Sequence, residues 1–365
     1  MKKLLALILA LAMLLTLCVG CGVQKEEPSG DEIVSEELPV IRYGAFLDML
    51  KSSLIYIAVT NGYDIEEGVD VELVNVSKSA EALTSLITEK DEIDMWGMQI
   101  MPTCTFIGNG ADLVIFGGNV AEGGAMISAK GQAQQYRDDL NNLKGKTILG
   151  IRGETGVLAL IAKLVEMGFD VNKDITIKWA DAPGVLEGVS KGEGDVGCLP
   201  IEYTYFGDDV NAEVVFQTGE VAENYICCRM TTTRKILDER REDLKNVVKA
   251  EIRAYKFMQE NKAETVKLLA EYSGQDEAYV EQNVYNVRIS FVPDPYANAV
   301  GPFYNVLGLL DMFESADATG VDVMDHVDVS LYKDALDELM EEYPGDACYE
   351  QLLEIFNRQN SVVIG

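Results

Sequence analysis

A turn at residues 152–156, with the sequence Arg-Gly-Glu-Thr-Gly, has residue types that suit an anion-binding site. It lies between an apolar run typical of a strand and a periodic segment typical of a helix. Free N–H groups at a helix start attract anions, the glycines let the backbone approach a ligand, and Arg152 can hold a carboxylate or sulfonate with two N–H groups. Glu154 has the opposite preference. Its carboxylate either favours an amine on the ligand or lies in solvent at the start of the helix. The predicted ligand-binding residues of this turn are Arg152, Gly153, Glu154, Thr155 and Gly156.

Aromatic and polar side chains also follow other predicted strands. Phe46 could stack on a ligand or pack in the core, and the serines that follow it could offer hydroxyls or cap a helix. A tryptophan at a strand end could form one wall of a site, although core packing explains it nearly as well. An acid and a phenol after a later strand suit a polar heterocycle or an amine. The residues predicted to bind ligand here are Phe46, Ser52, Ser53, Trp96, Gly97, Glu202 and Tyr203.

Composition excludes several classes of site. The 365 residues contain a single histidine, His326, so a multi-histidine zinc site and a histidine-based triad with a supporting network are excluded. A formal net charge of −31 argues against nucleic acid as a partner. We find no catalytic set, and we expect no metal and no cofactor. Five cysteines besides Cys18 and Cys21 have irregular spacing and give no disulfide framework. The vicinal pair, Cys227 and Cys228, is expected to be small buried residues on a strand.

A unit of strand, helix, strand, helix and strand occurs twice, about a hundred residues apart. Ile41 corresponds to Ile148 and Asp94 to Asp195. Alternating elements of this kind predict an α/β fold of two lobes, each a mostly parallel sheet with flanking helices, with the ligand in a cleft at the carboxyl ends of the strands. Two crossings rich in glycine, near 117–124 and 219–224, would form a hinge. Strands are predicted at 40–44, 69–73, 93–97, 113–116, 147–151, 175–179, 194–198 and 225–230, and helices near 52–61, 80–87, 157–168, 184–191, 244–255 and 332–343.

The amino terminus has the pattern of an export signal. Two lysines precede an apolar run at 4–17, which is too short to span a bilayer comfortably. The segment Cys18-Val19-Gly20-Cys21 resembles a bacterial lipobox, which implies a lipid on Cys21; the alternative is an ordinary signal peptide cut near Gly20. We therefore predict a signal peptide at 1–20, a lipidated tether at 21–38, lobe one at 39–120 plus 225–365, and lobe two at 121–224. The protein would be lipid-anchored to the outer face of the bacterial cytoplasmic membrane.

Several blocks resemble one branch of the periplasmic solute-binding proteins, the branch of sulfonate, nitrate, taurine and thiamine-pyrimidine transporters. The similar blocks are Ile55–Tyr63, Glu67–Glu72, Ala80–Asp94, Leu143–Ile148 and Gly192–Val196. The resemblance implies a two-lobed periplasmic-binding-protein fold of type II, a small-molecule ligand, and delivery to an ABC permease with its ATPase. The chain departs from the pattern at 199–203 and at 153–156, where the family binds ligand, so the ligand's identity does not carry over.

Two other functions remain open from the sequence. A pyrimidine synthase of thiamine biosynthesis shares the implied fold, but it is intracellular and carries a cysteine-rich motif that is not found here. A ligand-sensing ectodomain of a membrane receptor would have the same export signal. Because the export signal opposes an intracellular enzyme, we expect a transport protein and not an enzyme.

Overall fold

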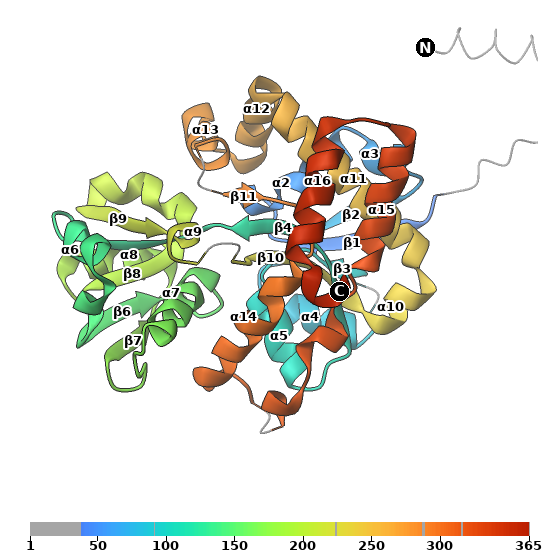
Figure 1. Cartoon of the computed structure of the whole chain (residues 1–365). Coiled ribbons are helices and arrows are strands. Elements are labelled where there is room, and N and C mark those ends of the chain that lie inside the picture. The colour runs from blue at the N-terminus through green and yellow to red at the C-terminus, as the bar shows by residue number, and fades with distance from the viewer. Residues whose placement is uncertain (1–37, 91, 223–224, 287–288, 315–316, 365) are drawn as a thin grey trace, which may run out of the picture. The chain divides into compact units, whose positions relative to one another are not determined.

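Two mixed β-sheets organise the computed structural model, which describes residues 38–364 apart from residue 91 and residues 223–224, 287–288 and 315–316. The predicted signal peptide, the lipidation site at Cys21 and all of the tether except residue 38 lie outside the described residues. Each sheet carries its own helices (Figure 1). The predicted α/β class is confirmed.

The first sheet has six strands in the order β11-β4-β10-β3-β1-β2. Strand β1 pairs in parallel with β2 and β3, whereas β10 is antiparallel to both β3 and β4, and β11 is antiparallel to β4. The strands of this sheet are β1 (Val40–Ala45), β2 (Asp70–Asn75), β3 (Met95–Trp96), β4 (Leu113–Glu122), β10 (Cys228–Thr233) and β11 (Ser290–Phe291).

The second sheet has five strands in the order β7-β6-β8-β5-β9. Strand β6 pairs in parallel with β7 and β8, and β5 is antiparallel to β8 and β9. Each sheet thus combines parallel strands from the repeated unit with antiparallel strands from the segments near the crossings. The strands of this sheet are β5 (Gly124–Ala129), β6 (Lys146–Gly150), β7 (Ile175–Trp179), β8 (Val196–Pro200) and β9 (Ala212–Gln217).

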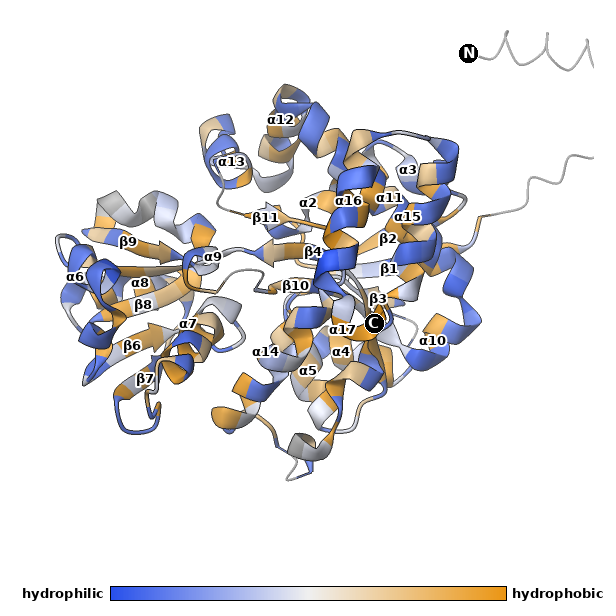
Figure 2. Ribbon diagram, in the orientation of Figure 1, coloured by the Kyte–Doolittle hydropathy of each residue, from blue (hydrophilic) through white to orange (hydrophobic). Residues whose placement is uncertain are grey.

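Helices cover the sheets with amphipathic faces. The predicted apolar face of α11 (Arg241–Glu260) is buried, with Leu244, Val248 and Ile252 at 0% exposure, and α11 packs against α2 and α15. Figure 2 shows apolar residues concentrated along the strands of both sheets. The other helices around the first sheet are α2 (Ser53–Thr60), α3 (Tyr63–Glu66), α4 (Ser79–Ile87), α5 (Ile100–Gly108), α10 (Arg234–Glu239), α12 (Lys262–Ser273), α13 (Glu277–Val284), α14 (Ala297–Leu309), α15 (Ser330–Glu342), α16 (Ala347–Gln359) and α17 (Ser361–Ile364).

Four helices belong to the segment that forms the second sheet, and short 3-10 helices occur in both parts. Helices α7 and α8 both contact β5 and β8. The four helices are α6 (Ala133–Asp138), α7 (Thr155–Glu166), α8 (Ala182–Lys191) and α9 (Thr218–Val221). The 3-10 helices are η1 (Leu50–Ser52), η2 (Leu140–Leu143), η3 (Ile201–Val210), η4 (Ala318–Gly320) and η5 (Val323–His326).

The chain passes between the sheets at two points that touch one another. Only Gly123 separates β4 from β5, and the return path lies between α9 and β10. A Cβ atom on Gly219 would lie 1.8 Å from Glu122 Oε2, so the two crossings pack closely at this glycine. The strands of the first sheet come from 40–122 and 228–291, and those of the second from 124–217. The lobe boundaries at 120–121 and 224–225 stay a prediction.

One predicted strand was placed too early. The sequence suggested a strand at 225–230, but β10 begins at Cys228, and Tyr225, Ile226 and Cys227 belong to the crossing. These residues are apolar because the crossing is buried, with Ile226 at 0% exposure. Apolar character alone therefore did not distinguish a strand from a buried connection.

Candidate functional site

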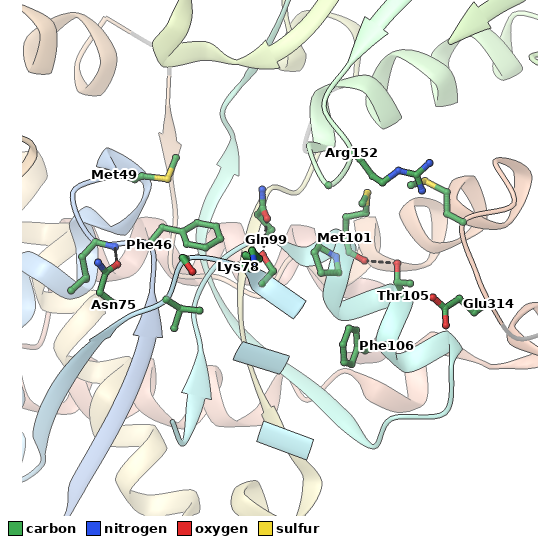
Figure 3. A pocket seen from close by; sticks show the side chains of 17 residues that line it. Phe46, Met49, Asn75, Lys78, Gln99, Met101, Thr105, Phe106, Arg152 and Glu314 are labelled. Carbon is green, nitrogen blue, oxygen red and sulfur yellow. Dashed lines mark hydrogen bonds between the residues drawn. The ribbon is translucent and has the colours of Figure 1, made fainter. Parts of the chain in front are cut away.

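A cavity of about 660 Å³ lies at the carboxyl ends of four strands. Residues that directly follow β1, β2, β3 and β6 contribute to its wall, which is where open α/β sheets bind ligands. Figure 3 shows Arg152 reaching this cavity from the segment after β6, while Phe46, Lys78, Gln99 and Met101 reach it from the first sheet. The cavity is lined by Phe46, Leu47, Met49, Asn75, Val76, Ser77, Lys78, Ser79, Gln99, Met101, Pro102, Thr105, Phe106, Arg152, Gly153, Met312 and Glu314.

Two helices begin at this cavity without a side-chain cap. The N-cap residues are Lys78 for α4 and Gln99 for α5, and neither side chain accepts a hydrogen bond from its helix. The Ser79 hydroxyl instead donates to Gln99 Oε1 at 2.8 Å, which ties the two helix starts together. Uncapped amides at a helix start are available to an anionic or acceptor group, and α4 offers such amides. At α5 the Ile100 N–H instead donates to the Cys227 carbonyl at 3.0 Å, and Pro102 in the same turn has no N–H.

Charged and apolar side chains share the cavity wall. Lys78 and Arg152 are the cations and Glu314 the carboxylate among its lining residues. The Arg152 guanidinium lies 5.4 Å from the centroid of the Trp179 ring, so a cation–π contact holds one face of this cation. Two phenylalanines, Phe46 and Phe106, and three methionines supply apolar surface. The wall therefore suits a ligand that has both an anionic group and an apolar body.

Three of the residues predicted from the sequence, Phe46, Arg152 and Gly153, line this cavity. Gly153 adopts a φ of +98°, which favours glycine and allows the turn to close against the cavity. The sequence analysis did not select Lys78, Gln99 or the other residues at the two helix starts. A signal was present at 77–79, where two hydroxyls and an amine directly precede a periodic helix, but the loop after the second strand was not considered.

Four other predicted residues are buried beside this cavity and do not line it. Ser52 Oγ donates to the Phe46 carbonyl at 2.9 Å, and Ser53 Oγ donates to the Leu50 carbonyl, so both hydroxyls are used within the segment after β1. Trp96 is fully buried and meets the Phe46 ring edge-on, with the centroids 5.1 Å apart. A Cβ on Gly97 would lie 1.9 Å from Tyr43 Oη, so this glycine is needed for packing. A direct role of these four residues in binding stays a prediction.

A buried lysine from the part of the chain that forms the first sheet faces side chains from the part that forms the second. This lysine was not predicted from the sequence. Lys51, in η1, is 4% exposed, and its Nζ lies 3.8 Å from Glu154 Oε1 and 3.8 Å from Glu202 Oε2. Glu154 is the N-cap of α7 and Glu202 is in η3, so one amine from the first part of the chain faces two carboxylates from the second. Gly123 makes room for this lysine, because a Cβ there would lie 3.0 Å from Lys51 Cε.

Burial dominates the electrostatics of this cluster, which we call the Lys51 cluster (Lys51, Glu154, Glu202 and Cys227). Burial raises the pKa of the Glu154 carboxyl to about 7, although Lys51 acts in the opposite direction. Burial also raises the pKa of Glu202. Burial lowers the pKa of Lys51, but its anionic neighbours, with Cys227 first, outweigh this and the pKa is raised, so the amine stays charged. Glu202 Oε2 is buried without a hydrogen-bond partner among the described residues.

The remaining predicted residues of the Arg152 turn lie in or against the Lys51 cluster. Glu154 accepts a hydrogen bond from the Gly156 N–H at 2.6 Å, so it caps its own helix and is not the solvated carboxylate that the sequence left open. Thr155 is 3% exposed, and a hydrogen bond from its side chain helps to lower the pKa of Cys227. The turn is thus divided: Arg152 and Gly153 face the cavity, and the next three residues face the interior.

Tyr203 and Glu202 also line a second, smaller cavity of about 300 Å³. Met49 contributes to both cavities, so the segment after β1 separates them. The smaller cavity is lined by Asp48, Met49, Leu50, Glu202, Tyr203, Ser273, Gln275 and Tyr279. Ligand binding by Glu202 and Tyr203 stays a prediction.

Two other features are absent from the part of residues 38–364 that the structure describes. No group of three or more histidine, cysteine or acidic residues there could hold a metal ion. No helix in the same residues is long and apolar enough to cross a membrane.

The sequence matches the profile of the NMT1-like family over residues 43–272, which is more than half of the chain. The chain belongs to the NMT1-like family. This NMT1-like protein is also 22% identical over 252 residues to the putative binding protein YtlA of Bacillus subtilis, which covers 67% of this chain and 75% of that protein.

Solved structures with the same fold carry names of import proteins. A putative periplasmic sulfonate-binding protein, SsuA from Methylobacillus flagellatus, matches 84% of the NMT1-like chain and 96% of its own, with a TM-score of 0.67 and 15% identity. The aliphatic sulphonate-binding protein SsuA of Escherichia coli matches 81% of the NMT1-like chain and 100% of its own chain, with a TM-score of 0.66 and 15% identity. At these identities the likeness shows the fold, and it confirms the predicted two-lobed periplasmic-binding-protein fold with two crossings.

Proposed function

We propose that this NMT1-like protein is the extracytoplasmic solute-binding component of an ABC importer. It holds a small organic solute in the 660 Å³ cavity and delivers it to a permease with its ATPase. The observation that carries the proposal is the cavity itself, where the uncapped start of α4 and two cations lie at the carboxyl ends of the strands. Family membership and the names of the structural relatives support the class of function.

Within this class, the wall favours an organic anion that has an apolar body. The uncapped amides of α4, together with Arg152, suit a sulfonate or carboxylate. Lys78 is a second cation of the wall, and its amine also pairs with Glu81 at 2.9 Å. The phenylalanines and methionines would be left uncovered by an ion as small as nitrate. The wall supplies no general base paired with a nucleophile, so the proposal is binding without chemical change.

A ligand panel tests this proposal. Alkanesulfonates, taurine, nitrate and a pyrimidine are added to the purified protein, and the melting temperature is measured. A ligand at a hundred times its dissociation constant stabilises the folded state by about 2.7 kcal/mol, which raises the melting temperature by several degrees. We expect an organic sulfonate or carboxylate to give the largest shift and to be recovered unchanged. Recovery of an altered compound would contradict the transport proposal and favour an enzyme.

Anchoring by a lipid on Cys21 is a separate part of the proposal. Replacing Cys21 with alanine in a bacterial host removes the residue that would carry the acyl chains. We expect the wild-type protein in the membrane fraction and the Cys21→Ala variant released from it. Cys18→Ala is the matched control and is expected to leave the protein in the membrane fraction. Intact Cys21→Ala protein in the membrane fraction would show that the apolar segment at 4–17 is the anchor.

A further inference from the structure

Two neighbouring cysteines at the second crossing bring their sulfur atoms together. Cys227 Sγ and Cys228 Sγ are 3.5 Å apart, and the two residues are 3% and 0% exposed. Consecutive side chains of a regular strand point to opposite faces, which would separate the two sulfurs. Here Cys227 precedes β10, and the pairing of β10 with β4 shifts register between Cys228 and Arg229. The backbone therefore departs from a regular strand at the point where it places both sulfurs on one side.

The two sulfurs lie among cations. A hydrogen bond from the Cys228 thiol, with Lys51, Thr155 and Arg229, lowers the pKa of Cys227 to about 5, even though burial acts in the opposite direction. The same hydrogen bond raises the pKa of Cys228. Within the pair, Cys227 is therefore the sulfur that ionises more readily. Burial raises the pKa of Cys104 and Cys198, so those buried cysteines are held as thiols.

We propose that Cys227 and Cys228 form a redox-active dithiol that a hydroperoxide oxidises reversibly to a vicinal disulfide. The separation of the two sulfurs and the irregular backbone at the crossing carry this proposal. It is independent of which solute the larger cavity binds.

With hydrogen peroxide as the oxidant, the reaction has two steps. The Cys227 thiolate attacks one peroxide oxygen, an S–O bond forms, and the O–O bond breaks. The hydroxide that leaves takes up the proton that Cys227 released on ionising. Cys228 Sγ then attacks the sulfur of the Cys227 sulfenic acid, the S–S bond forms, the S–O bond breaks, and the hydroxide leaves with the Cys228 proton as water. Two thiols and one peroxide give one disulfide and two waters, and a dithiol reductant reverses the change.

Oxidation would alter the contact between the two parts of the chain. The thiolate of Cys227 is one of the anions that face Lys51, together with Glu154 and Glu202. Disulfide formation removes that charge, and it constrains the backbone of one of the two crossings. The dithiol therefore lies where its oxidation state can change the contact between the part of the chain that forms the first sheet and the part that forms the second.

The test follows each cysteine of the purified full chain by alkylation before and after reduction. Treatment with hydrogen peroxide is expected to block Cys227 and Cys228 together, with the loss of two hydrogen atoms in mass, and dithiothreitol should restore both. Cys228→Ser keeps a hydrogen-bond donor beside Cys227 and is expected to stop at a Cys227 sulfenic acid that dimedone traps, and Cys227→Ala should leave Cys228 reduced. Cys198→Ala is the matched control, because it removes another buried thiol and should leave the reaction unchanged.

The wild-type measurement decides the proposal even if a variant fails to fold. If Cys227 and Cys228 are alkylated as fully as Cys198 when the chain is denatured after peroxide treatment of the folded protein, the proposal is wrong. A gain of oxygen on Cys227 in the wild-type chain without loss of the Cys228 thiol would also overturn it, because the second step would then not occur.

Discussion

Replacing Lys51 with methionine is expected to lower the free energy of unfolding by about 3–5 kcal/mol at pH 8, because removal of one partner leaves buried charge uncompensated. The Lys51 amine lies 3.8 Å from a carboxylate oxygen of Glu154 and 3.8 Å from one of Glu202, and all three side chains are at most 7% exposed. Methionine keeps the apolar stem of the side chain but not its charge. The loss of stability should shrink as the pH falls below about 7, because burial raises the pKa of Glu154 to about 7 and also raises that of Glu202.

Urea denaturation at several pH values measures this effect. Lys163→Met is the matched control, since it also removes one lysine charge, from α7, where Lys163 pairs with the exposed Glu166. A surface pair of that kind contributes about 0–1 kcal/mol. Equal stability of Lys51→Met and the wild-type protein would show that Lys51 does not compensate the two carboxylates.

Replacing Glu154 with glutamine is expected to have the opposite effect and to raise the free energy of unfolding. Burial raises the pKa of Glu154 from 4.5 to about 7, so the folded state binds this proton more tightly than the unfolded state does. The wild-type protein therefore loses stability as the pH rises from about 4.5 through about 7. At about 1.4 kcal/mol per pKa unit, the ionised carboxylate costs about 3 kcal/mol at pH 8. Glutamine avoids this cost and keeps an oxygen that can accept the Gly156 N–H.

We therefore expect Glu154→Gln to be more stable than the wild-type protein by about 3 kcal/mol at pH 8 and nearly equal to it at pH 4.5, measured by urea denaturation. Glu187→Gln is the control, because this glutamate of α8 is exposed and pairs with Lys191 at the surface. A Glu154→Gln variant that is less stable than the wild-type protein at pH 8 would mean that pairing with Lys51 outweighs the cost of burial.

The sequence predicted the elements well because hydrophobic periodicity is a local property. The strand at Ile175–Trp179 has the predicted bounds, and the helix expected near 157–168 is α7, Thr155–Glu166. The position of the site followed from topology, since strand ends meet at one edge of a parallel sheet. Phe46 and Arg152 were found by this reasoning, and both line the larger cavity.

The direction of individual side chains could not be predicted in the same way. Ser52 and Ser79 each stand at a helix start after a strand, but Ser52 is bonded to the Phe46 carbonyl, whereas Ser79 lines the cavity. Lys51 is a further case, because in the sequence it is a charged residue in a connection. Its carboxylate partners are more than a hundred residues away along the chain, and only the packing of the two parts brings them together.

The ligand is expected to bind in the larger cavity, beneath the Arg152 turn. Isothermal titration of the anion that gives the largest thermal shift, with wild-type protein, Arg152→Met and the charge-matched control Lys163→Met, tests it most directly. Loss of a hydrogen bond to a charged group costs about 1.5–3 kcal/mol, so we expect Arg152→Met to weaken binding roughly 10- to 100-fold. Lys163→Met should bind as the wild-type protein does. Unchanged affinity in Arg152→Met would contradict the claim and place the ligand elsewhere.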